Sequence, residues 1–167
     1  MRINWTAART SALLSILFLV VYGATNLLAS LRSDVPSFHF DWEHNTPFVP
    51  LIFVPYISID LLFVAAPFLC RTDRRRRTLA NRLAAATILG GLCFLLFPLR
   101  FAFERPPVAG LLGKAFDLFR QMDQPFNQCP SLHVALASIL LGEYLRFVQD
   151  RMRNRRALAA TLAAATW

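Results

Sequence analysis

Residues 71–99 read RTDRRRRTLANRLAAATILGGLCFLLFPL, and this stretch decides the fold. Six arginines and one aspartate lie in Arg71–Arg82, and an uncharged apolar run follows from Leu83 to Leu99. A soluble helix is apolar along one stripe only, whereas this run is apolar on every side. Arginine clusters beside such runs mark the cytoplasmic side of a membrane. The stretch therefore predicts a membrane-spanning helix, in which Gly90 and Gly91 allow another helix to approach closely.

Similar apolar runs lie on both sides of this stretch. Residues 11–31 contain no charged side chain, and residues 49–70 contain only Asp60. A helix needs roughly 20 residues to cross a bilayer, so the eleven apolar residues 157–167 would be only part of a span. The sequence predicts an all-α, polytopic helical membrane protein with a single transmembrane domain over 1–167. Its expected spans are four complete helices at about 11–31, 49–70, 83–99 and 131–148, and a partial fifth at 157–167.

Composition agrees with a membrane protein and excludes several other classes. The chain is 56% hydrophobic, with a mean hydropathy of +0.44. Its net charge of +8 could indicate nucleic-acid binding. The basic residues cluster between apolar runs, however, where topology determinants lie. Membrane lipids are therefore the expected partners, without nucleic acid. The three cysteines have neither metal-ligand spacing nor an even pairing, so no metal, cofactor or disulfide is expected.

The distribution of basic residues predicts the orientation. With four alternating spans, thirteen of the 18 basic residues share the side of the N-terminus, and five lie on the other side. The positive-inside rule makes the thirteen-residue side cytoplasmic. The loop 100–130 then faces outward, to the periplasm of a bacterial inner membrane or to an equivalent lumenal space. Within it, apolar residues at 112, 115, 116, 119 and 122 have helical spacing. A short amphipathic helix is expected over 111–122, lying on the membrane surface or covering a site.

Four side chains that could bind a phosphate and protonate its leaving oxygen are expected at this outer face. Arg100 and Arg105 follow one apolar run, and Ser131 and His133 begin the next. Two guanidinium groups can bind a phosphate, and an imidazole can protonate its leaving oxygen. Pro130 favours a helix start, where free N–H groups attract anions. The expected substrate is a phosphorylated lipid.

Three further polar residues, Asp60, His39 and His44, could contribute to the phosphate site or only to the structure around it. Asp60 lies near the middle of a predicted span, where an ionisable group needs a partner or a water-filled cavity. It is either an anchor for an arginine of the phosphate site or a hydrogen-bonded residue of helix packing. His39 and His44 lie in an outer loop, which is a poor platform for a nucleophile that must be held in line with phosphate.

At these positions the chain resembles the type 2 phosphatidic acid phosphatase superfamily, and within it the branch of the inositol phosphorylceramide synthases and related bacterial membrane phosphatases. Pro130-Ser131-Leu132-His133 matches the Pro-Ser-Leu-His form of that family's second motif. Arg105-Pro106 matches the end of its first motif. The lysine of the first motif falls on Pro98, so Arg100 would have to replace it.

The resemblance implies that the chain forms the first part of a six-helix core. It also implies a role for each of the four residues at the phosphate site. Arg105 and Arg100 would bind phosphate, Ser131 would donate hydrogen bonds to it, and His133 would be the general acid. The family's third motif, with the histidine that forms a phosphohistidine, has no match here. We therefore expect a membrane phosphatase or phosphotransferase that is truncated and inactive alone. Hydrolysis and transfer remain open, and so does a non-enzymatic, lipid-binding remnant.

Overall fold

The structure is a computed structural model that describes residues 4–104, 106–123 and 125–165. Within these ranges the chain is all-helical and forms no β-strand, although isolated bridges join Ser37 to Arg100 and Leu99 to Asn127. The α-helices are α1 (Trp5–Ser30), α2 (Phe53–Leu69), α3 (Asp73–Leu96), α4 (Gly110–Met122) and α5 (Leu132–Ala165), and two 3₁₀-helices are η1 (Asp41–Asn45) and η2 (Pro50–Ile52).

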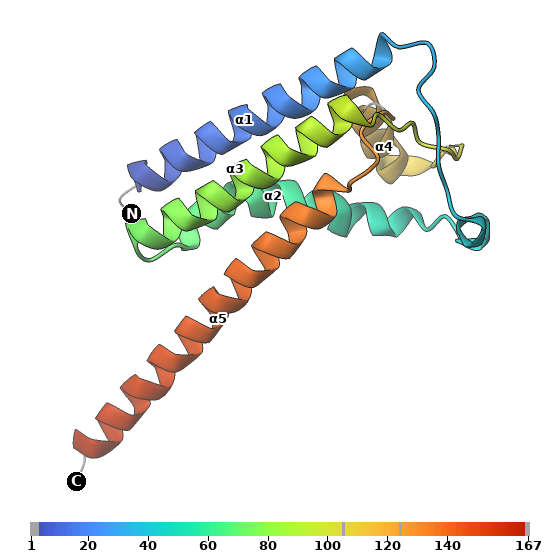
Figure 1. The fold of residues 1–167 in the computed structure, drawn as a ribbon. Helices are drawn as coiled ribbons and strands as arrows, with labels where there is room; N and C mark the ends of the chain where they lie inside the picture. Colours follow the sequence, from blue (N-terminus) through green and yellow to red (C-terminus); the bar gives the residue numbers. More distant parts are fainter. Residues whose placement is uncertain (1–3, 105, 124, 166–167) are drawn as a thin grey trace.

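The long helices form one bundle with two distinct ends. Helices α1 and α3 run parallel and in contact, and α2 and α5 run in the opposite direction (Figure 1). We call the end with the tight turn between α2 and α3 the α2–α3 end, and the opposite end, where α4 lies, the α4 end. Helix α5 starts near the α4 end and continues beyond the bundle past the α2–α3 end (Figure 1).

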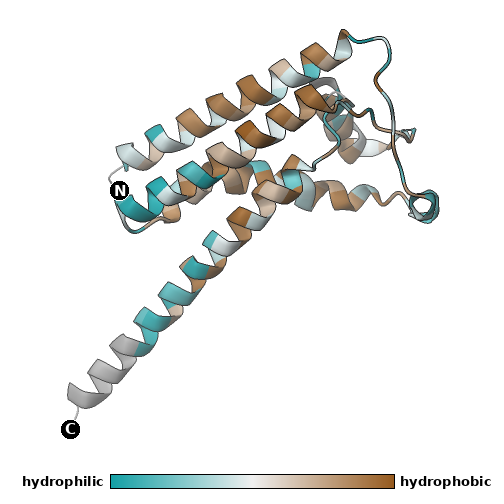
Figure 2. Ribbon diagram, in the orientation of Figure 1, coloured by the Kyte–Doolittle hydropathy of each residue, from teal (hydrophilic) through white to brown (hydrophobic). Residues whose placement is uncertain are grey.

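Three of the helices are long and apolar enough to cross a membrane: Trp5–Ser30, Pro50–Leu69 and Asp73–Leu96. Their outward side chains are apolar too, and Leu13, Leu19 and Leu27 of α1 are each more than half exposed. Figure 2 shows hydrophobic residues along most of α1 and α2 and along the later part of α3. A large exposed apolar surface of this kind marks contact with lipid. The prediction of an all-helical chain with apolar helices long enough to span a membrane is confirmed for these three helices.

The fourth and fifth predicted spans differ from the structure. Residues 132–148 and the described part of 157–167 belong to one continuous helix, α5, and α5 is not among the helices apolar enough to span. Glu143 and Arg146 interrupt its apolar first half. The charged segment 149–156, which separates the two predicted spans, is itself helical. It contains no Gly or Pro, and its Arg, Met and Gln residues are good helix formers.

Helix α3 also begins about ten residues earlier than predicted. The Thr72 side chain caps it by accepting a hydrogen bond from the N–H of Arg75 at 3.3 Å, and Asp73 places a negative charge in the first turn. Both features stabilise a helix N-terminus. The arginine-rich segment is therefore the first part of α3 rather than a loop.

Close packing between helices depends on the glycine pair predicted for this role. A Cβ atom on Gly91 would lie 2.3 Å from Cγ1 of Val21 on α1, and one on Gly90 would lie 3.2 Å from Cδ1 of Leu132 on α5. The shared core contains one apolar face of α5, from Leu132 through Leu136 to Leu140. Spacing of four residues keeps these side chains on one side of the helix.

Charged groups connect the helices at the α2–α3 end. Arg75 of α3 forms an ion pair with Glu143 of α5, and its Nη1 lies 2.7 Å from Oδ2 of Asp150. Arg76 is buried, pairs with Asp73, and donates a hydrogen bond from Nε to the Pro67 carbonyl at 3.3 Å. The basic segment thus joins α2, α3 and α5, in addition to the topological role expected from the sequence.

Candidate functional site

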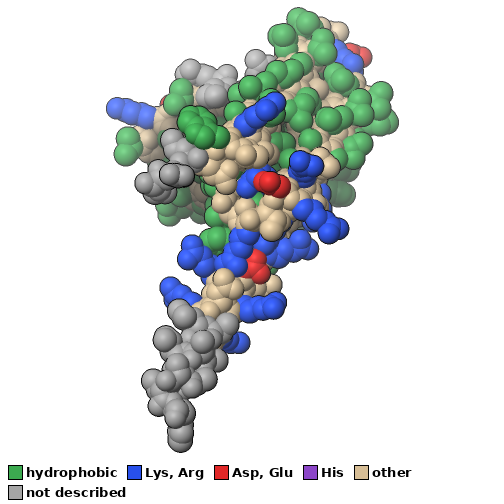
Figure 3. Space-filling view, turned by 90° about the vertical axis from the view of Figure 1, so that its left-hand side faces the viewer, with side chains coloured by type: hydrophobic (Ala, Val, Ile, Leu, Met, Phe, Trp, Pro, Cys, Tyr) green, Lys and Arg blue, Asp and Glu red, His purple; other side chains and the backbone are tan. Residues whose placement is uncertain are grey.

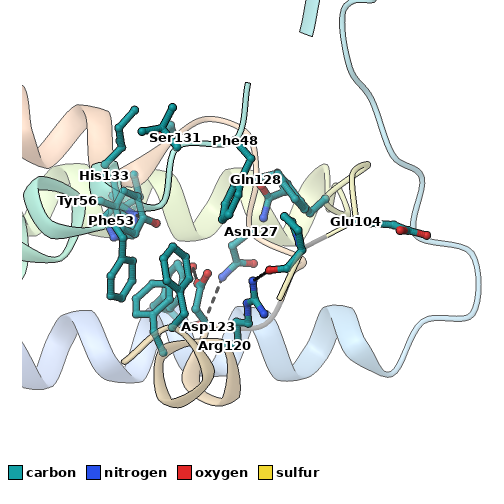
Figure 4. A pocket seen from close by; sticks show the side chains of 18 of the residues that line it. Phe48, Phe53, Tyr56, Glu104, Arg120, Asp123, Asn127, Gln128, Ser131 and His133 are labelled. Atoms are coloured by element: carbon teal, nitrogen blue, oxygen red, sulfur yellow. Dashed lines mark hydrogen bonds between the residues drawn. The ribbon is translucent and has the colours of Figure 1, made fainter. Parts of the chain in front are cut away.

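A cavity of about 470 Å³ opens at the α4 end of the bundle. Residues from α1, α2, α4, the loops around residues 47–49 and 101–106, and the start of α5 line it. One part of the lining is aromatic, with Phe48, Phe53, Phe116 and Phe119 (Figure 4). The other part is polar, with Arg120, Asp123, Asn127, Gln128, Ser131 and His133. A ligand with both apolar and polar parts fits such a lining.

His133 is held in the cavity by a tyrosine of α2. Its Nδ1 lies 3.0 Å from the hydroxyl of Tyr56, and the two rings stack with centroids 4.2 Å apart. If the Tyr56 hydroxyl donates to Nδ1, the neutral imidazole carries its proton on Nε2. Nε2 makes no hydrogen bond to any residue that the structure describes. His133 can therefore present an N–H group to a ligand in the cavity.

Ser131 forms the start of α5. Its Oγ accepts a hydrogen bond from the N–H of Val134 at 3.3 Å, the usual arrangement for a helix N-cap. This places Ser131, the first free N–H groups of the helix and His133 at one edge of the cavity. A helix N-terminus with unpaired N–H groups favours a bound anion.

Helix α4 contributes a guanidinium group that sequence reasoning missed. Arg120 donates a hydrogen bond from Nη2 to the Pro106 carbonyl at 2.6 Å and lies over the Phe116 ring, 5.4 Å from its centroid. Its Nε is buried and has no hydrogen-bond partner in the described part of the chain. The sequence placed Arg120 on the polar face of an amphipathic helix, and only the docking of that helix shows that this position borders the cavity.

Hydrogen bonds connect α1 to the segment that precedes α5. The Tyr22 hydroxyl donates to Oδ1 of Asp123 at 2.5 Å. Nδ2 of Asn127 donates to Thr25 Oγ1 at 2.8 Å and to the Tyr22 carbonyl at 3.2 Å. These bonds fix the floor of the cavity, because Tyr22, Asp123 and Asn127 all line it (Figure 4).

The structure brings two of the predicted site residues together and leaves Arg100 apart from them. Ser131 and His133 line the cavity, whereas Arg100 is exposed and does not line it. The N–H of Arg100 donates to the Pro36 carbonyl, and that of Phe101 to the Pro125 carbonyl. Successive side chains of an extended segment point to opposite sides. Since Phe101 faces the cavity, Arg100 faces away from it. Arg105 lies outside the described residues.

Asp60 does not act as the anchor of an arginine among the described residues. It lies on α2 one turn after Tyr56, the residue whose hydroxyl contacts Nδ1 of His133. Asp60 therefore belongs to the surroundings of the imidazole. The alternative role, a hydrogen-bonded residue of helix packing, is not seen either: the Asp60 side chain is exposed and forms no hydrogen bond to another described residue.

His39 and His44 form a separate pair outside the cavity. Their Nε2 atoms are 2.8 Å apart, and the Phe103 ring contacts both imidazoles, with centroids 5.3 and 5.4 Å away. Neither histidine lines the cavity. Within the described ranges, no group of three or more His, Cys, Asp or Glu side chains could hold a metal ion.

The charges of the described lining are mixed. Arg120 and His133 stand beside Asp123, and Glu104 points away from these three in Figure 4.

Comparison of the chain with protein-family models, with curated proteins and with solved structures gave no match.

Proposed function

We propose that this chain is an integral protein of a bacterial inner membrane that binds a phosphorylated lipid in the cavity at the α4 end. In this proposal it provides the phosphate-binding and leaving-group-protonating part of a site like that of the type 2 phosphatidic acid phosphatase superfamily. The observation that carries the proposal is that Ser131 and His133 line one cavity with Arg120 and a wall of aromatic rings.

The proposed orientation follows the positive-inside rule. The N-terminus and the α2–α3 end face the cytoplasm, and the cavity faces the periplasm. Leu132–Val148, the apolar half of α5, completes the membrane domain as a fourth and more polar span. The cavity then lies at the level of lipid headgroups, where a phosphate meets Ser131 and Arg120 and the acyl chains meet Phe53 and Phe116.

The proposed chemistry assigns one proton to His133. In displacement at phosphorus, a nucleophile forms a new bond to phosphorus while the bond to the lipid oxygen breaks. The leaving oxygen takes a proton, which Nε2 of His133 can donate when the imidazole is protonated on both nitrogens. In that form Nδ1–H donates to the Tyr56 hydroxyl oxygen, and the imidazole is neutral after the step. The resemblance implies that the nucleophile is a second histidine, and His133 is the single histidine of the described cavity lining.

The presence of a single histidine in the described cavity lining favours a second candidate function for the 167 residues. Attack by water on a phosphate monoester is very slow without a nucleophile or a metal ion to assist it. We infer that residues 1–167 bind a lipid phosphate without releasing phosphate. The choice between hydrolase, transferase and non-enzymatic lipid-binding protein then depends on the source of the nucleophile.

Binding and turnover are tested separately on the purified chain in nanodiscs. Fluorescent phosphatidic acid should bind, and phosphate release should stay at the level of empty nanodiscs. Arg120→Gln should weaken binding roughly tenfold, since a hydrogen bond to a charged group contributes about 1.5–3 kcal/mol. Arg100→Gln is the matched control, because Arg100 is exposed and lies outside the lining.

The outcomes separate the parts of the proposal. Equal effects of Arg120→Gln and Arg100→Gln would refute the assignment of this cavity as the phosphate site. Phosphate release that disappears in His133→Ala would instead establish a nucleophile within the 167 residues, and His39 and His44 would be mutated next.

A further inference from the structure

A second cavity, of about 350 Å³, lies at the α2–α3 end, opposite the site described above. Its lining comes from two places that are far apart in the sequence. The end of α2 and the following turn contribute residues 68–71, and α5 contributes one face. That face consists of Phe147, Arg151, Asn154 and Arg155, whose spacing of three and four residues places them on one side of the helix.

The cavity collects positive charge without a carboxylate to balance it. Arg71, Arg151 and Arg155 line it, and its lining contains no Asp or Glu. The nearest acids already pair with other arginines: Glu143 and Asp150 with Arg75, and Asp73 with Arg76. Among the described residues, none of the three lining guanidinium groups forms an ion pair. Guanidinium groups without a carboxylate partner are suited to bidentate binding of phosphate.

Two of these arginines are already positioned by their neighbours. With the Asn154 amide oriented so that its nitrogen donates to the Asp150 carbonyl, its oxygen accepts from Nη1 of Arg71 at 3.1 Å. The guanidinium of Arg151 lies over the Phe147 ring, 5.4 Å from the centroid. Such contacts reduce the entropy lost when an anion binds, because the side chains are partly ordered beforehand.

The remaining lining is apolar and joins the membrane-spanning surface. Phe68 and Leu69 belong to the last turn of α2, and Phe68 is 47% exposed. Figure 3 shows basic side chains gathered where α5 leaves the bundle, next to hydrophobic side chains of the helices above; the lysine of this chain, Lys114, is on α4, so these are arginines. Cations and exposed apolar groups thus meet at one opening. An acyl chain can lie against Phe68 while the phosphate of the same molecule meets the arginines.

We propose that this cavity binds the phosphate headgroup of an anionic phospholipid of the surrounding leaflet. The shared chemistry is a phosphate group, and the apolar lining selects the lipid rather than free phosphate as its source. Basic pockets beside membrane helices on the cytoplasmic side are suited to such headgroups. The site is independent of the function proposed for the α4 end, because the two cavities share no lining residue.

The test compares two triple variants of equal charge. The site variant is Arg71→Gln/Arg151→Gln/Arg155→Gln. The control variant is Arg74→Gln/Arg153→Gln/Arg156→Gln, whose three arginines are exposed on α3 and α5 but do not line the cavity. Both variants lower the net charge by three. The non-specific electrostatic attraction of the protein to anionic lipid therefore decreases equally in the site variant and the control variant.

The probe is phosphatidylglycerol with a fluorescent acyl chain, titrated into the full chain in a non-ionic detergent. The site variant should bind it at least tenfold more weakly than wild type, and the control variant within about twofold, since charge-assisted hydrogen bonds are stronger than general surface attraction. Phosphatidylcholine with the same fluorescent chain should bind no better to wild type than to the site variant.

Competition and a charge-preserving variant complete the experiment. Arg71→Lys/Arg151→Lys/Arg155→Lys should bind phosphatidylglycerol with intermediate affinity, because lysine keeps the charge and loses the bidentate geometry. It also supplies a folded reference if the glutamine variant unfolds. Equal loss in the site and control variants would overturn the proposal. Displacement of the lipid by inorganic phosphate at equal concentration would overturn the lipid as the ligand.

Discussion

At the scale of single residues, the position of His133 depends on one tyrosine. Tyr56 contributes both a stacked ring and a hydroxyl at 3.0 Å from Nδ1. Tyr56→Phe would keep the stacking and remove the hydrogen bond that selects the tautomer. We expect binding of phosphatidic acid to weaken about fivefold, because one such hydrogen bond contributes roughly 1 kcal/mol.

A titration in nanodiscs measures this effect against a matched control. Tyr144→Phe removes another tyrosine hydroxyl, which donates to the Leu62 carbonyl at 3.1 Å and does not line the cavity. Its binding curve should coincide with that of wild type. An unchanged curve for Tyr56→Phe would show that the Tyr56 hydroxyl does not orient His133 for the ligand.

The sequence identified only those site residues that are close together along the chain. Ser131 and His133 could be found because they fall within four residues of a recognisable helix start. Arg120, Asp123 and Tyr56 could not, because they meet only when α4 docks between α1 and α2. Arg100 does not line this cavity, and hydropathy gives no information on which way an extended segment turns its side chains.

At the scale of the helices, the contact between α1 and α3 depends on Gly91. A methyl group there would meet Val21 at 2.3 Å, so Gly91→Ala should separate the helices. We expect a loss of about 1–3 kcal/mol in the free energy of unfolding, as is typical of overpacking. Gly23→Ala on α1 is the control, since nothing lies within 4 Å of its added Cβ.

Denaturant titration in detergent distinguishes the two glycine variants. Gly23→Ala should be neutral or stabilising, because alanine is favoured over glycine inside a helix by roughly 0.5–1 kcal/mol. A Gly91→Ala variant as stable as Gly23→Ala would contradict the close packing of α1 and α3.

The ion pair between Arg75 and Glu143 holds α5 against α3. Glu143 is buried, and Glu143→Gln would remove the buried charge that pairs with Arg75, whose other acidic partner, Asp150, is more exposed. We expect about 2 kcal/mol of destabilisation in the same titration, as for a buried polar group that loses its partner. Asp73→Asn, at an acid that is 74% exposed, should change stability by less than about 1 kcal/mol. If Glu143→Gln and Asp73→Asn destabilise the protein equally, the ion pair between Arg75 and Glu143 is not what holds α5 against α3.

Hydropathy located the helices but did not define all of their ends. It predicted α1, α2, α4 and the later part of α3, because apolar periodicity reports which residues avoid water. It failed for the start of α3 and the length of α5, since arginine is both highly polar and a good helix former. The capping residues Asn4 and Thr72 were the local signals of the earlier starts of α1 and α3.

At the scale of the whole molecule, cysteine labelling tests the orientation. Cys129 is exposed near the α4 end, whereas Cys70 is buried at the α2–α3 end. A membrane-impermeant maleimide added to intact cells with permeable outer membranes should label Cys129. Labelling of Cys129 only after the inner membrane is opened would reverse the proposed topology.

Cys70 supplies an internal reference for the same experiment. Burial, together with the nearby charge of Glu143, raises the pKa of the Cys70 thiol to about 11. Since the thiolate is the reactive form, the folded protein should label there roughly 100-fold more slowly than at an ordinary cysteine. Rapid labelling of Cys70 in opened membranes would show that α2, α3 and α5 do not pack as described.

Helix α5 also has a mechanical consequence, because it is unbroken from Leu132 to Ala165. A rise of 1.5 Å per residue puts His133 about 15 Å on one side of Glu143 and Arg153 about 15 Å on the other. The Arg75 attachment at Glu143 then acts as the fulcrum of a lever with nearly equal arms. If α5 tilts as a rigid rod about this contact, the imidazole moves by a similar distance in the direction opposite to the arginine-bearing arm.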